Sequence, residues 1–250
     1  CALDKGKTFM ACTDTWSSDY AGTAEMKLIV KKAAAYTLAD LAGVWENNAL
    51  ASGPGAPWWN RGPITVNADG TFSGTLEEYP DETDSWSGAF QISSDGVITF
   101  VGYPSGQCSM DASKTIIVCA ATWSTGDPGT TELRLMTKKG SSYSLADLAG
   151  SWHVNDLASG PGEPWWGRGS MTINADGSAT AILTYSDGDA STDNATFSIT
   201  ADGAITGYMS SSFKCTMNST KTVIACTSTW EHGSGAGTSE LSIVTKAIAP

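Results

Sequence analysis

The sequence predicts an all-β chain of tandem small eight-stranded antiparallel up-and-down barrels, and three observations support this fold class. The chain of 250 residues repeats itself in one frame, because Cys1, Cys108 and Cys215 stand 107 residues apart (108 − 1 and 215 − 108). Short segments with strand-like alternation are separated by turn sequences at intervals of about a dozen residues. The 27 glycines, ten tryptophans and 16% charged residues are typical of a globular, turn-rich chain.

The repeat frame divides the chain into three segments. The sequence Tyr36-Thr-Leu-Ala-Asp-Leu-Ala-Gly returns as Tyr143-Ser-Leu-Ala-Asp-Leu-Ala-Gly, so residues 36–142 and 143–250 are two full repeats. Residues 1–35 match the end of a repeat and are expected to form only its last three strands. A period this long indicates that each repeat is a whole domain.

Eight strands are expected in each full repeat. In the first, they begin at Gly43, Ile64, Thr71, Trp86, Val97, Gln107, Thr115 and Thr131. Asn67-Ala-Asp-Gly70 and Ser93-Ser-Asp-Gly96 predict tight turns whose glycines have positive φ. Thr37-Leu-Ala-Asp40 predicts a capped helical turn before the first strand. Because closure removes the exposed edges of a meander, the eight strands are expected to form a barrel.

A β-propeller is the alternative architecture. Four strands would then form one blade, and the partial first repeat would be completed by the other end of the chain. However, the two copies match over the whole 107-residue period without half-period similarity, whereas the blades of a propeller usually resemble one another. The sequence therefore favours barrels.

Six cysteines occur as three equally spaced pairs and predict three local disulfides, Cys1–Cys12, Cys108–Cys119 and Cys215–Cys226. Direct opposition across a hairpin requires a turn centred near Ser113 and Lys114 and its counterparts. Zinc would need cysteines and histidines clustered at short spacings, which are not visible. Disulfides indicate an extracellular or cell-surface location, so we expect that an export signal has been removed.

The start of each full repeat resembles a known family. A short helical turn followed by Gly43-Val-Trp45 or Gly150-Ser-Trp152 resembles the Gly-x-Trp start of lipocalin-like (calycin) barrels. The resemblance implies that the tryptophan packs across the closed barrel end beneath a basic residue of the last strand, a place for Lys138 or Lys139 and for Lys246. The repeats are shorter than typical lipocalins. The whole chain also resembles exported bacterial tandem-repeat proteins of uncharacterised function, which implies a surface location.

The strongest candidate binding surface is a loop present in both full repeats, residues 51–62 and 158–169. It contains the candidate ligand-binding residues Trp58, Trp59 and Arg61 in one copy and Trp165, Trp166 and Arg168 in the other. Adjacent tryptophans beside an arginine can stack on a sugar or an aromatic ligand. Alternatively, they form a structural plug over the barrel mouth. Exposure on one common groove would indicate a ligand site, and burial would indicate the plug.

A weaker candidate is a calcium site on Asp187, Asp189, Ser191 and Asp193, whose oxygens fall at alternate positions. Thr192 replaces the glycine of an EF-hand loop, so a solvated acidic turn is favoured. No cofactor is expected.

Charge and motifs limit the classes of function. A net charge of −12 argues against nucleic acid, and no apolar run approaches the roughly 20 residues of a membrane helix. His153 and His232 are not kept between the repeats, so no enzyme is expected. The leading hypothesis is an extracellular structural or adhesive protein that forms homo-oligomers, self-assembling head-to-tail into a filament. The alternative is a secreted carbohydrate- or small-ligand-binding module that uses the barrel mouths or the Trp-Trp-Arg loops.

Overall fold

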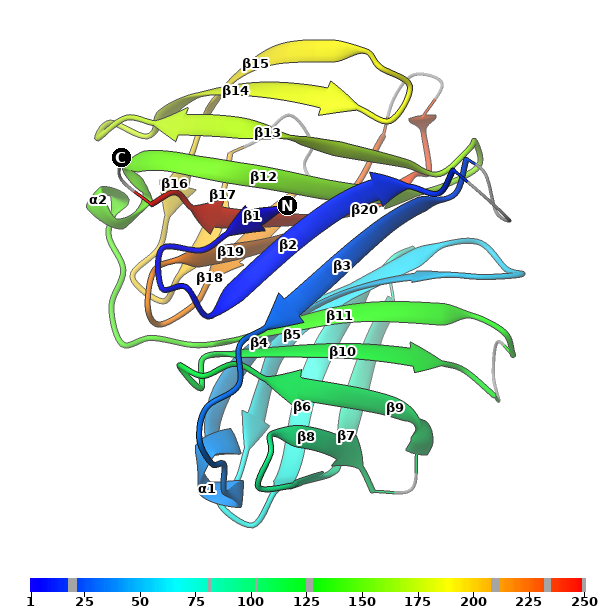
Figure 1. Cartoon of the computed structure of the whole chain (residues 1–250), viewed down its shortest axis with the longest axis vertical. Helices are drawn as coiled ribbons and strands as arrows, with labels where there is room; N and C mark the ends of the chain where they lie inside the picture. Colours follow the sequence, from blue (N-terminus) through cyan, green and yellow to red (C-terminus); the bar gives the residue numbers. More distant parts are fainter. Residues whose placement is uncertain are drawn as a thin grey trace.

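The computed structural model of the chain describes residues 1–17, 22–80, 82–101, 103–124, 128–207, 212–231 and 235–248. It is nearly all β, with three sheets and two single-turn helices (Figure 1). Each sheet is built from one of the three segments of the repeat frame. We call them the partial repeat, the first barrel and the second barrel, in chain order.

The first barrel is a closed sheet of eight antiparallel strands in the order β10-β11-β4-β5-β6-β7-β8-β9. Its elements are α1 (Leu38–Leu41), β4 (Gly43–Ser52), β5 (Trp58–Val66), β6 (Thr71–Glu78), β7 (Glu82–Ile92), β8 (Val97–Phe100), β9 (Tyr103–Met110), β10 (Ile116–Thr122) and β11 (Thr131–Lys138). Consecutive strands are neighbours, and the last strand pairs with the first. This is the predicted up-and-down barrel, and it is not a propeller.

The second barrel is a sheet of nine strands in the order β15-β14-β13-β12-β20-β19-β18-β17-β16. Its elements are α2 (Leu145–Leu148), β12 (Gly150–Ser159), β13 (Trp165–Ile173), β14 (Ser178–Tyr185), β15 (Ala190–Thr196), β16 (Ser198–Ile199), β17 (Ala204–Thr206), β18 (Lys214–Met217), β19 (Val223–Thr229) and β20 (Ser239–Lys246). The two ends of the sheet, β15 and β16, are consecutive in the chain and separated only by Phe197. The barrel is therefore nearly closed.

Three strands of the first barrel begin earlier than the sequence predicted. β5 begins at Trp58 instead of Ile64, β7 at Glu82 instead of Trp86, and β9 at Tyr103 instead of Gln107. The largest difference arises because the predicted long loop is short, and its tryptophans already belong to a paired strand, with Trp58 opposite Ala51. This difference changes the interpretation of the Trp-Trp-Arg residues below.

One end of each barrel is closed by a tryptophan. Trp45 is fully buried, its Nε1 donates to the carbonyl of Leu41, and Lys138 Nζ lies 5.3 Å from the centre of its ring. Trp152 and Lys246 repeat this arrangement at 5.0 Å. Gly43 has a φ of +128°, where a side chain would be strained and its Cβ would lie 3.2 Å from Lys138 Cε. The expected position of the basic residue over the tryptophan is thus confirmed for Lys138 and Lys246.

Lys139, the other candidate for that position, instead forms ion pairs with Glu46 and Asp202. The helical turn below the tryptophan is capped as predicted, since Asp40 Oδ2 accepts hydrogen bonds from the backbone N–H and the hydroxyl of Thr37. These contacts fix the closed end of the barrel.

The three predicted disulfides are present. Cys108 and Cys119 are directly opposite each other on β9 and β10, which places the centre of the hairpin between Ser113 and Lys114. Lys114 takes the positive φ that this turn needs, and the carboxylate of Asp111 accepts the backbone N–H groups of Thr115 and Ile116. Asp111, Thr115 and Ile116 at the base of this hairpin are buried.

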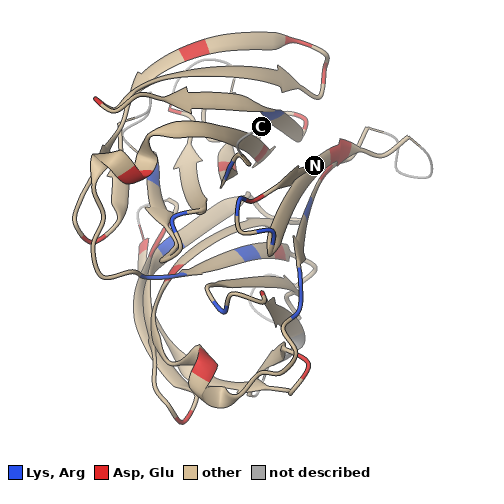
Figure 2. Cartoon of the chain, turned by 60° about the vertical axis from the view of Figure 1, so that its left-hand side comes forward, with Lys and Arg blue, Asp and Glu red and all other residues tan. Residues whose placement is uncertain are grey.

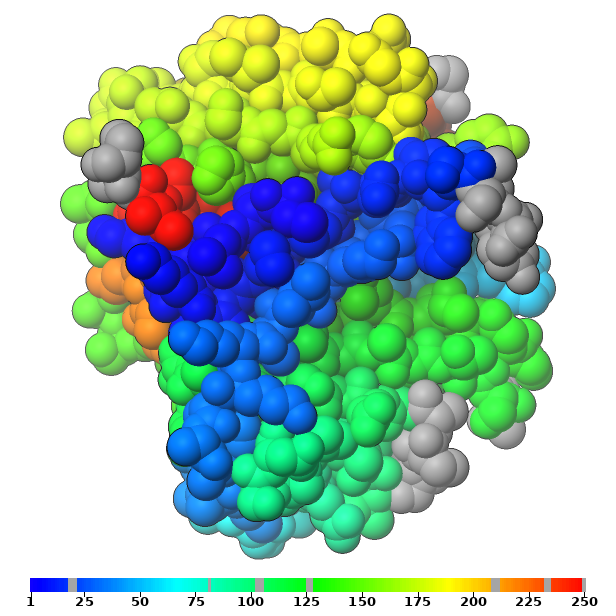
Figure 3. Space-filling view, in the orientation of Figure 1, coloured from blue at the N-terminus to red at the C-terminus, as the bar shows by residue number. Residues whose placement is uncertain are grey.

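The partial repeat forms a three-stranded sheet of β1 (Ala2–Leu3), β2 (Phe9–Thr15) and β3 (Ala24–Val30). It lies across the junction of the two barrels, as the blue strands of Figures 1 and 3 show. Equivalent residues of the three repeats meet in one apolar cluster at this junction, for example Phe9, Ile116 and Val223. The repeats are therefore arranged around a pseudo-threefold centre.

Candidate functional site: an acid-lined cavity in the second barrel

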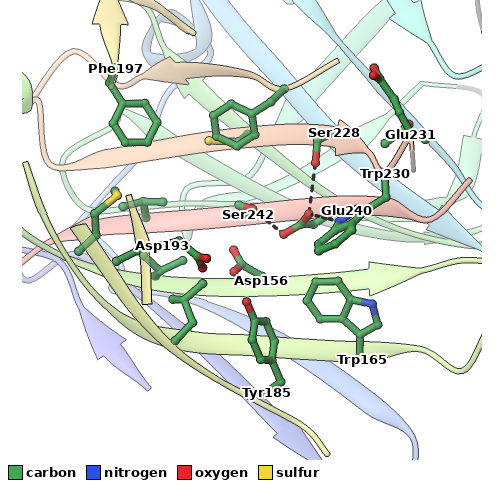
Figure 4. A pocket seen from close by; sticks show the side chains of 18 residues that line it. Asp156, Trp165, Tyr185, Asp193, Phe197, Ser228, Trp230, Glu231, Glu240 and Ser242 are labelled. Atoms are coloured by element: carbon green, nitrogen blue, oxygen red, sulfur yellow. Dashed lines mark hydrogen bonds between the residues drawn. The ribbon is translucent and has the colours of Figure 1, made fainter. Parts of the chain in front are cut away.

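A cavity of about 330 Å³ opens at the mouth of the second barrel, and Figure 4 shows the side chains that line it. Its inner wall is apolar and consists of side chains such as Val154, Met171, Leu183 and Val244, together with the Cys226 disulfide. Because β-strand side chains alternate between the two faces of a sheet, every second residue of these strands points into this space. The barrel interior thus supplies a pocket with a largely apolar wall.

Aromatic side chains form the rim of the cavity. Trp165 contacts Trp230 edge-to-face at 5.7 Å between ring centres, and it contacts Tyr185 in the same way at 5.6 Å. These rings come from β13, from the end of β14 and from the residue after β19. Figure 4 shows them around the acidic side chains. They can contact an apolar or cationic ligand at the mouth.

Three carboxyl groups lie between the apolar wall and the rim: Asp156 on β12, Asp193 on β15 and Glu240 on β20. Glu240 Oε2 accepts hydrogen bonds from Trp230 Nε1 at 2.9 Å and from Ser228 Oγ at 3.2 Å. Asp156 is buried, and its Oδ1 finds no hydrogen-bond donor in the described part of the chain. Glu240 is therefore held by several donors, whereas Asp156 is hydrogen-bonded to Ser242 and keeps one oxygen, Oδ1, without a donor among the described residues.

Burial raises the pKa of both buried acids. The pKa of Asp156 lies well above its usual range, first because it is desolvated and second because Glu240 carries a like charge nearby. Desolvation also raises the pKa of Glu240, while the hydrogen bonds from Trp230, Ser228 and Ser242 oppose this shift. The pair shares a site in which two negative charges are costly without a cation.

The first barrel is filled at the same place. Arg134 and Ser242 occupy equivalent positions, because each is paired with the second cysteine of its repeat. Trp86 stands where the second barrel has Asp193, and Ala49 stands where it has Asp156. A guanidinium and an indole thus occupy the space that the second barrel leaves open.

Arg134 is a buried cation whose three guanidinium nitrogens each have a partner. It forms a salt bridge with Glu132, its Nη1 donates to Asn47 Oδ1 at 2.9 Å, and its Cζ lies 4.4 Å from the ring centre of Trp86. In the second barrel, Glu240 is the counterpart of Glu132, but no lysine, arginine or histidine is among the described residues that line the cavity. The second barrel thus has an acid at the position of Glu132, but it has Ser242 at the position of the cation Arg134.

The Trp-Trp-Arg residues do not converge on one groove, as the ligand interpretation required. They belong to strands, so neighbouring side chains point to opposite faces. Trp165 faces the mouth of the second barrel and lines the cavity, whereas Trp166 is buried against the partial repeat, with its Nε1 donating to Thr15 Oγ1 at 2.6 Å. Arg168 lies beside Trp166, with its Cζ 4.6 Å from the ring centre.

The first copy divides in the same way. Trp58 contacts Trp123 edge-to-face at the mouth of the first barrel. Trp59 and Arg61 are buried between the barrels, where Trp59 Nε1 donates to Thr229 Oγ1 at 2.6 Å. The plug interpretation therefore describes neither copy completely, since one tryptophan of each pair lies at a mouth and the other joins two repeats.

The four residues of the calcium candidate are not gathered around one point. Asp187 and Asp189 are exposed at the turn, while Ser191 and Asp193 face the barrel, where Ser191 Oγ donates to Asp193 Oδ2 at 2.7 Å. In the described ranges, no group of three or more acidic, cysteine or histidine side chains is placed to hold a metal ion. Asp193 belongs to the cavity instead.

The histidines take no part in this site. His153 is on β12 between the inward-facing Trp152 and Val154, so it faces outward, and His232 lies outside the described residues. Sequence reasoning missed Asp156 and Glu240. A difference between the two copies could have indicated them. Asp156 replaces Ala49 and Ser242 replaces Arg134, at positions that are buried in both repeats.

Comparison with known proteins gives little further information. No protein-family model and no curated protein matches the chain. Among solved structures, a protein of unknown function from the DUF3598 family of Nostoc punctiforme is 12% identical with a TM-score of 0.29, over 84% of this chain and 97% of that one. Kievitone hydratase from Nectria haematococca is 6% identical with a TM-score of 0.28, over 84% of this chain and 90% of that one.

At these TM-scores neither likeness adds an argument about the fold, and neither confirms a lipocalin relationship. Kievitone hydratase is an enzyme, and the similarity to it contradicts the prediction that this protein is not an enzyme. At this TM-score the likeness carries no argument for a particular activity. No helix in the described part of the chain is long and apolar enough to span a membrane.

Proposed function

We propose that the protein is a secreted binding module whose second barrel takes a small organic cation with an apolar body. The observation that carries this proposal is the acid-lined cavity, whose described lining residues include no cation, at the place where the first barrel holds Arg134 against Glu132. A positively charged group of a ligand would fill the place of the guanidinium.

The unpartnered Asp156 oxygen supports a charged or strongly donating ligand. Leaving a buried polar group without a hydrogen bond costs about 1–3 kcal/mol, and more for a charged group. A protonated amine beside Asp156 and Glu240 removes this cost, because it donates hydrogen bonds and cancels the repulsion between the two acids. The cavity is therefore better suited to a cation than to a neutral molecule or an anion.

The apolar wall and the aromatic rim define the rest of the ligand. A volume of about 330 Å³ is small for a ligand pocket and suits a molecule with a single ring or a short alkyl chain. Trp165 and Trp230 can contact the apolar body or the cation itself. The first barrel demonstrates the geometry, since its guanidinium lies over the ring of Trp86.

The whole protein favours cations as well. Its net charge is −12, and aspartates and glutamates lie over both barrels (Figure 2). Three disulfides are consistent with an extracellular site of action. Carbohydrate binding stays a second possibility for the same rim, and the adhesive or filament hypothesis stays a prediction, since no feature of the described residues favours it over ligand binding.

Binding titrations followed by tryptophan fluorescence test this proposal. The probes are matched pairs, such as phenethylamine and its neutral alcohol, added to the full chain. We expect the amine to saturate at one site per chain and the alcohol to bind far more weakly. Asp156→Asn should weaken amine binding about 10- to 150-fold, the range for one lost charged hydrogen bond.

Asp187→Asn is the matched control, because it removes the same charge from the exposed turn of the same barrel. It should leave the affinity for amines almost unchanged. Equal binding of amine and alcohol, or an equal loss in both variants, would show that the cavity does not select cations. Tight binding of a neutral sugar at this rim would favour the carbohydrate alternative.

Proton transfer is a second candidate function of the same residues. Two neighbouring carboxyl groups with raised pKa, in an apolar cavity, are a setting in which one can donate and the other accept a proton. A bound amine or alcohol that is chemically converted by the native protein, but not by Asp156→Asn, would identify this activity. Binding without conversion favours the module.

A further inference from the structure

The two complete contacts between repeats are built alike. In the first, β4 and β5 of the first barrel pack on β19 and β20 of the second, with Trp59 Nε1 donating to Thr229 Oγ1. In the other, β12 and β13 of the second barrel pack on β2 and β3 of the partial repeat, with Trp166 Nε1 donating to Thr15 Oγ1. Thr15 and Thr229 are equivalent positions of their repeats.

The arginines of the two contacts also bind equivalent positions. Arg61 Nη1 donates to the carbonyl of Thr227 at 3.0 Å, and Arg168 Nη1 approaches the carbonyl of Thr13 at 3.4 Å. Thr13 and Thr227 are again equivalent. Each contact therefore includes a tryptophan and an arginine from the second strand of one repeat, which lie on the penultimate strand of another.

The contacts have a direction that leads around the pseudo-threefold centre. The first barrel donates its tryptophan to the second barrel, and the second donates to the partial repeat. The next step would run from the partial repeat to the first barrel, where the equivalent acceptors are Ala120 and Thr122 on β10. The partial repeat has only its last three strands, so the described chain supplies no tryptophan for this step.

The surface of the third contact is open. Ala120 and Thr122 are exposed, whereas Thr13, Thr227 and Thr229 are buried. A groove of about 530 Å³ lies beside them, lined by β3 of the partial repeat and by β10 and β11 of the first barrel. Figure 3 shows this side of the molecule, with β3 at the surface.

The same place offers a strand edge. In both barrels the first strand pairs with the last, Ser52 opposite Thr131 and Ser159 opposite Ser239. β3 is the last strand of its repeat, and it lies at the edge of its sheet, paired only with β2 in the described structure. Its Ile29 is 45% exposed, although the equivalent Met136 and Val244 lie inside barrels. An exposed edge of this kind accepts a further strand.

Two equivalent serines also lie near the pseudo-threefold centre. Ser52 and Ser159 are equivalent residues, and their Oγ atoms are 2.9 Å apart, as expected for residues that face one another near a rotation axis. Leu50 and Leu157 line the groove next to them. A third serine and a third leucine, from a strand paired with β3, would complete these sets.

We infer that this groove is a docking site for a polypeptide segment that carries the first five strands of the same repeat. Its first strand adds antiparallel to β3, with the counterpart of Ser52 opposite Ala24. Its second strand places a Trp-x-Arg pair on Thr122 and Ala120. A second copy of this chain is not the occupant, because its own Trp59 and Trp166 are already buried in contacts between its repeats.

The experiment adds residues 36–107 ahead of Cys1 in the full chain, so that the added segment meets Cys1 as Gln107 meets Cys108. Amide hydrogen exchange is measured along β3 and across residues 120–122, with the particle mass recorded for both chains. We expect a monomer in which exchange at both places slows by at least about tenfold relative to the original chain.

Two variants separate docking from simple folding of the added strands. Alanine at the added counterparts of Trp59 and Arg61 should leave the protection of β3 but remove that of residues 120–122. Ala120→Arg, at a position that is exposed in the original chain, should do the same. Unchanged exchange at residues 120–122 in the extended chain would overturn the inference, and so would protection of β3 in a dimer of the original chain.

Discussion

Asp156 is the residue whose charge makes the stability of the second barrel depend on pH. Its folded pKa is raised above the ordinary value of 3.8, so at pH values between the two the folded protein holds a proton that the unfolded chain has released. The sign follows from linkage: this contribution to stability is present below about pH 3.8 and is lost as pH rises through the raised pKa.

We therefore expect Asp156→Asn to increase the free energy of unfolding at neutral pH and to have a smaller effect near pH 4. Urea unfolding of both proteins across this range measures the difference. Glu240 titrates nearby, and hence the variant should flatten the pH profile only in part. A variant with the same profile as the native protein would contradict the pKa assignment.

The affinity for an amine should also depend on the ionisation of Asp156, but it should rise with pH where the stability falls. A bound cation favours the ionised forms of Asp156 and Glu240, so affinity for an amine should rise with pH through their raised pKa values. It should fall again only where the amine itself loses its proton. Titrations at several pH values measure this, and an affinity that does not change with pH would exclude ionised acids as the recognition groups.

Arg134 is the matching residue of the first barrel. Replacing it by methionine leaves the buried Glu132 without its cation, which should cost about 3–5 kcal/mol of unfolding free energy. The double variant Arg134→Met with Glu132→Gln removes both charges and should lose clearly less. Thermal or urea unfolding of the two single variants and the double variant checks this coupling, and purely additive losses would contradict it.

At the scale of elements, strands β5 and β13 each serve two purposes by alternation. Trp59 joins the barrels, so Trp59→Ala should cost about 3–5 kcal/mol, as expected for a large buried aromatic residue. It should also separate the unfolding of the two barrels into two steps. Trp165→Ala should instead weaken ligand binding with a smaller loss of stability. Calorimetry of both variants distinguishes them, and a single shared transition in Trp59→Ala would show that the contact does not couple the barrels.

The elements that the sequence predicted well are those governed by local chemistry. The Asp-Gly turns, the capped turn at Thr37 and the hairpin that holds Cys108 and Cys119 depend on residues close together in the chain. The cavity could not be predicted in this way. It depends on residues that become neighbours only when the barrel closes, namely Asp156, Asp193, Glu240 and Ser242. The Trp-Trp-Arg residues were assigned to a loop, and this concealed the alternation that sends Trp58 and Trp59 to opposite faces.

At the scale of the whole molecule, the repeats share a frame but have different interiors. The first barrel encloses its own ion pair and serves as a packing unit, while the second keeps the acid and opens a cavity. The contacts between repeats are arranged in one direction around the pseudo-threefold centre, and three such contacts would form a closed ring. Head-to-tail growth into a filament stays a prediction that would need a different surface.

A crystal structure of the full chain with a bound aromatic amine tests the central claim most directly. We expect one amine in the second barrel, with its nitrogen about 2.7–2.9 Å from a carboxylate oxygen of Asp156 or Glu240 and its ring beside Trp165 or Trp230. In the first barrel, Arg134 should still lie on Trp86. An amine bound in the first barrel, or on Trp59 or Trp166 between the repeats, with the second barrel empty, would contradict it.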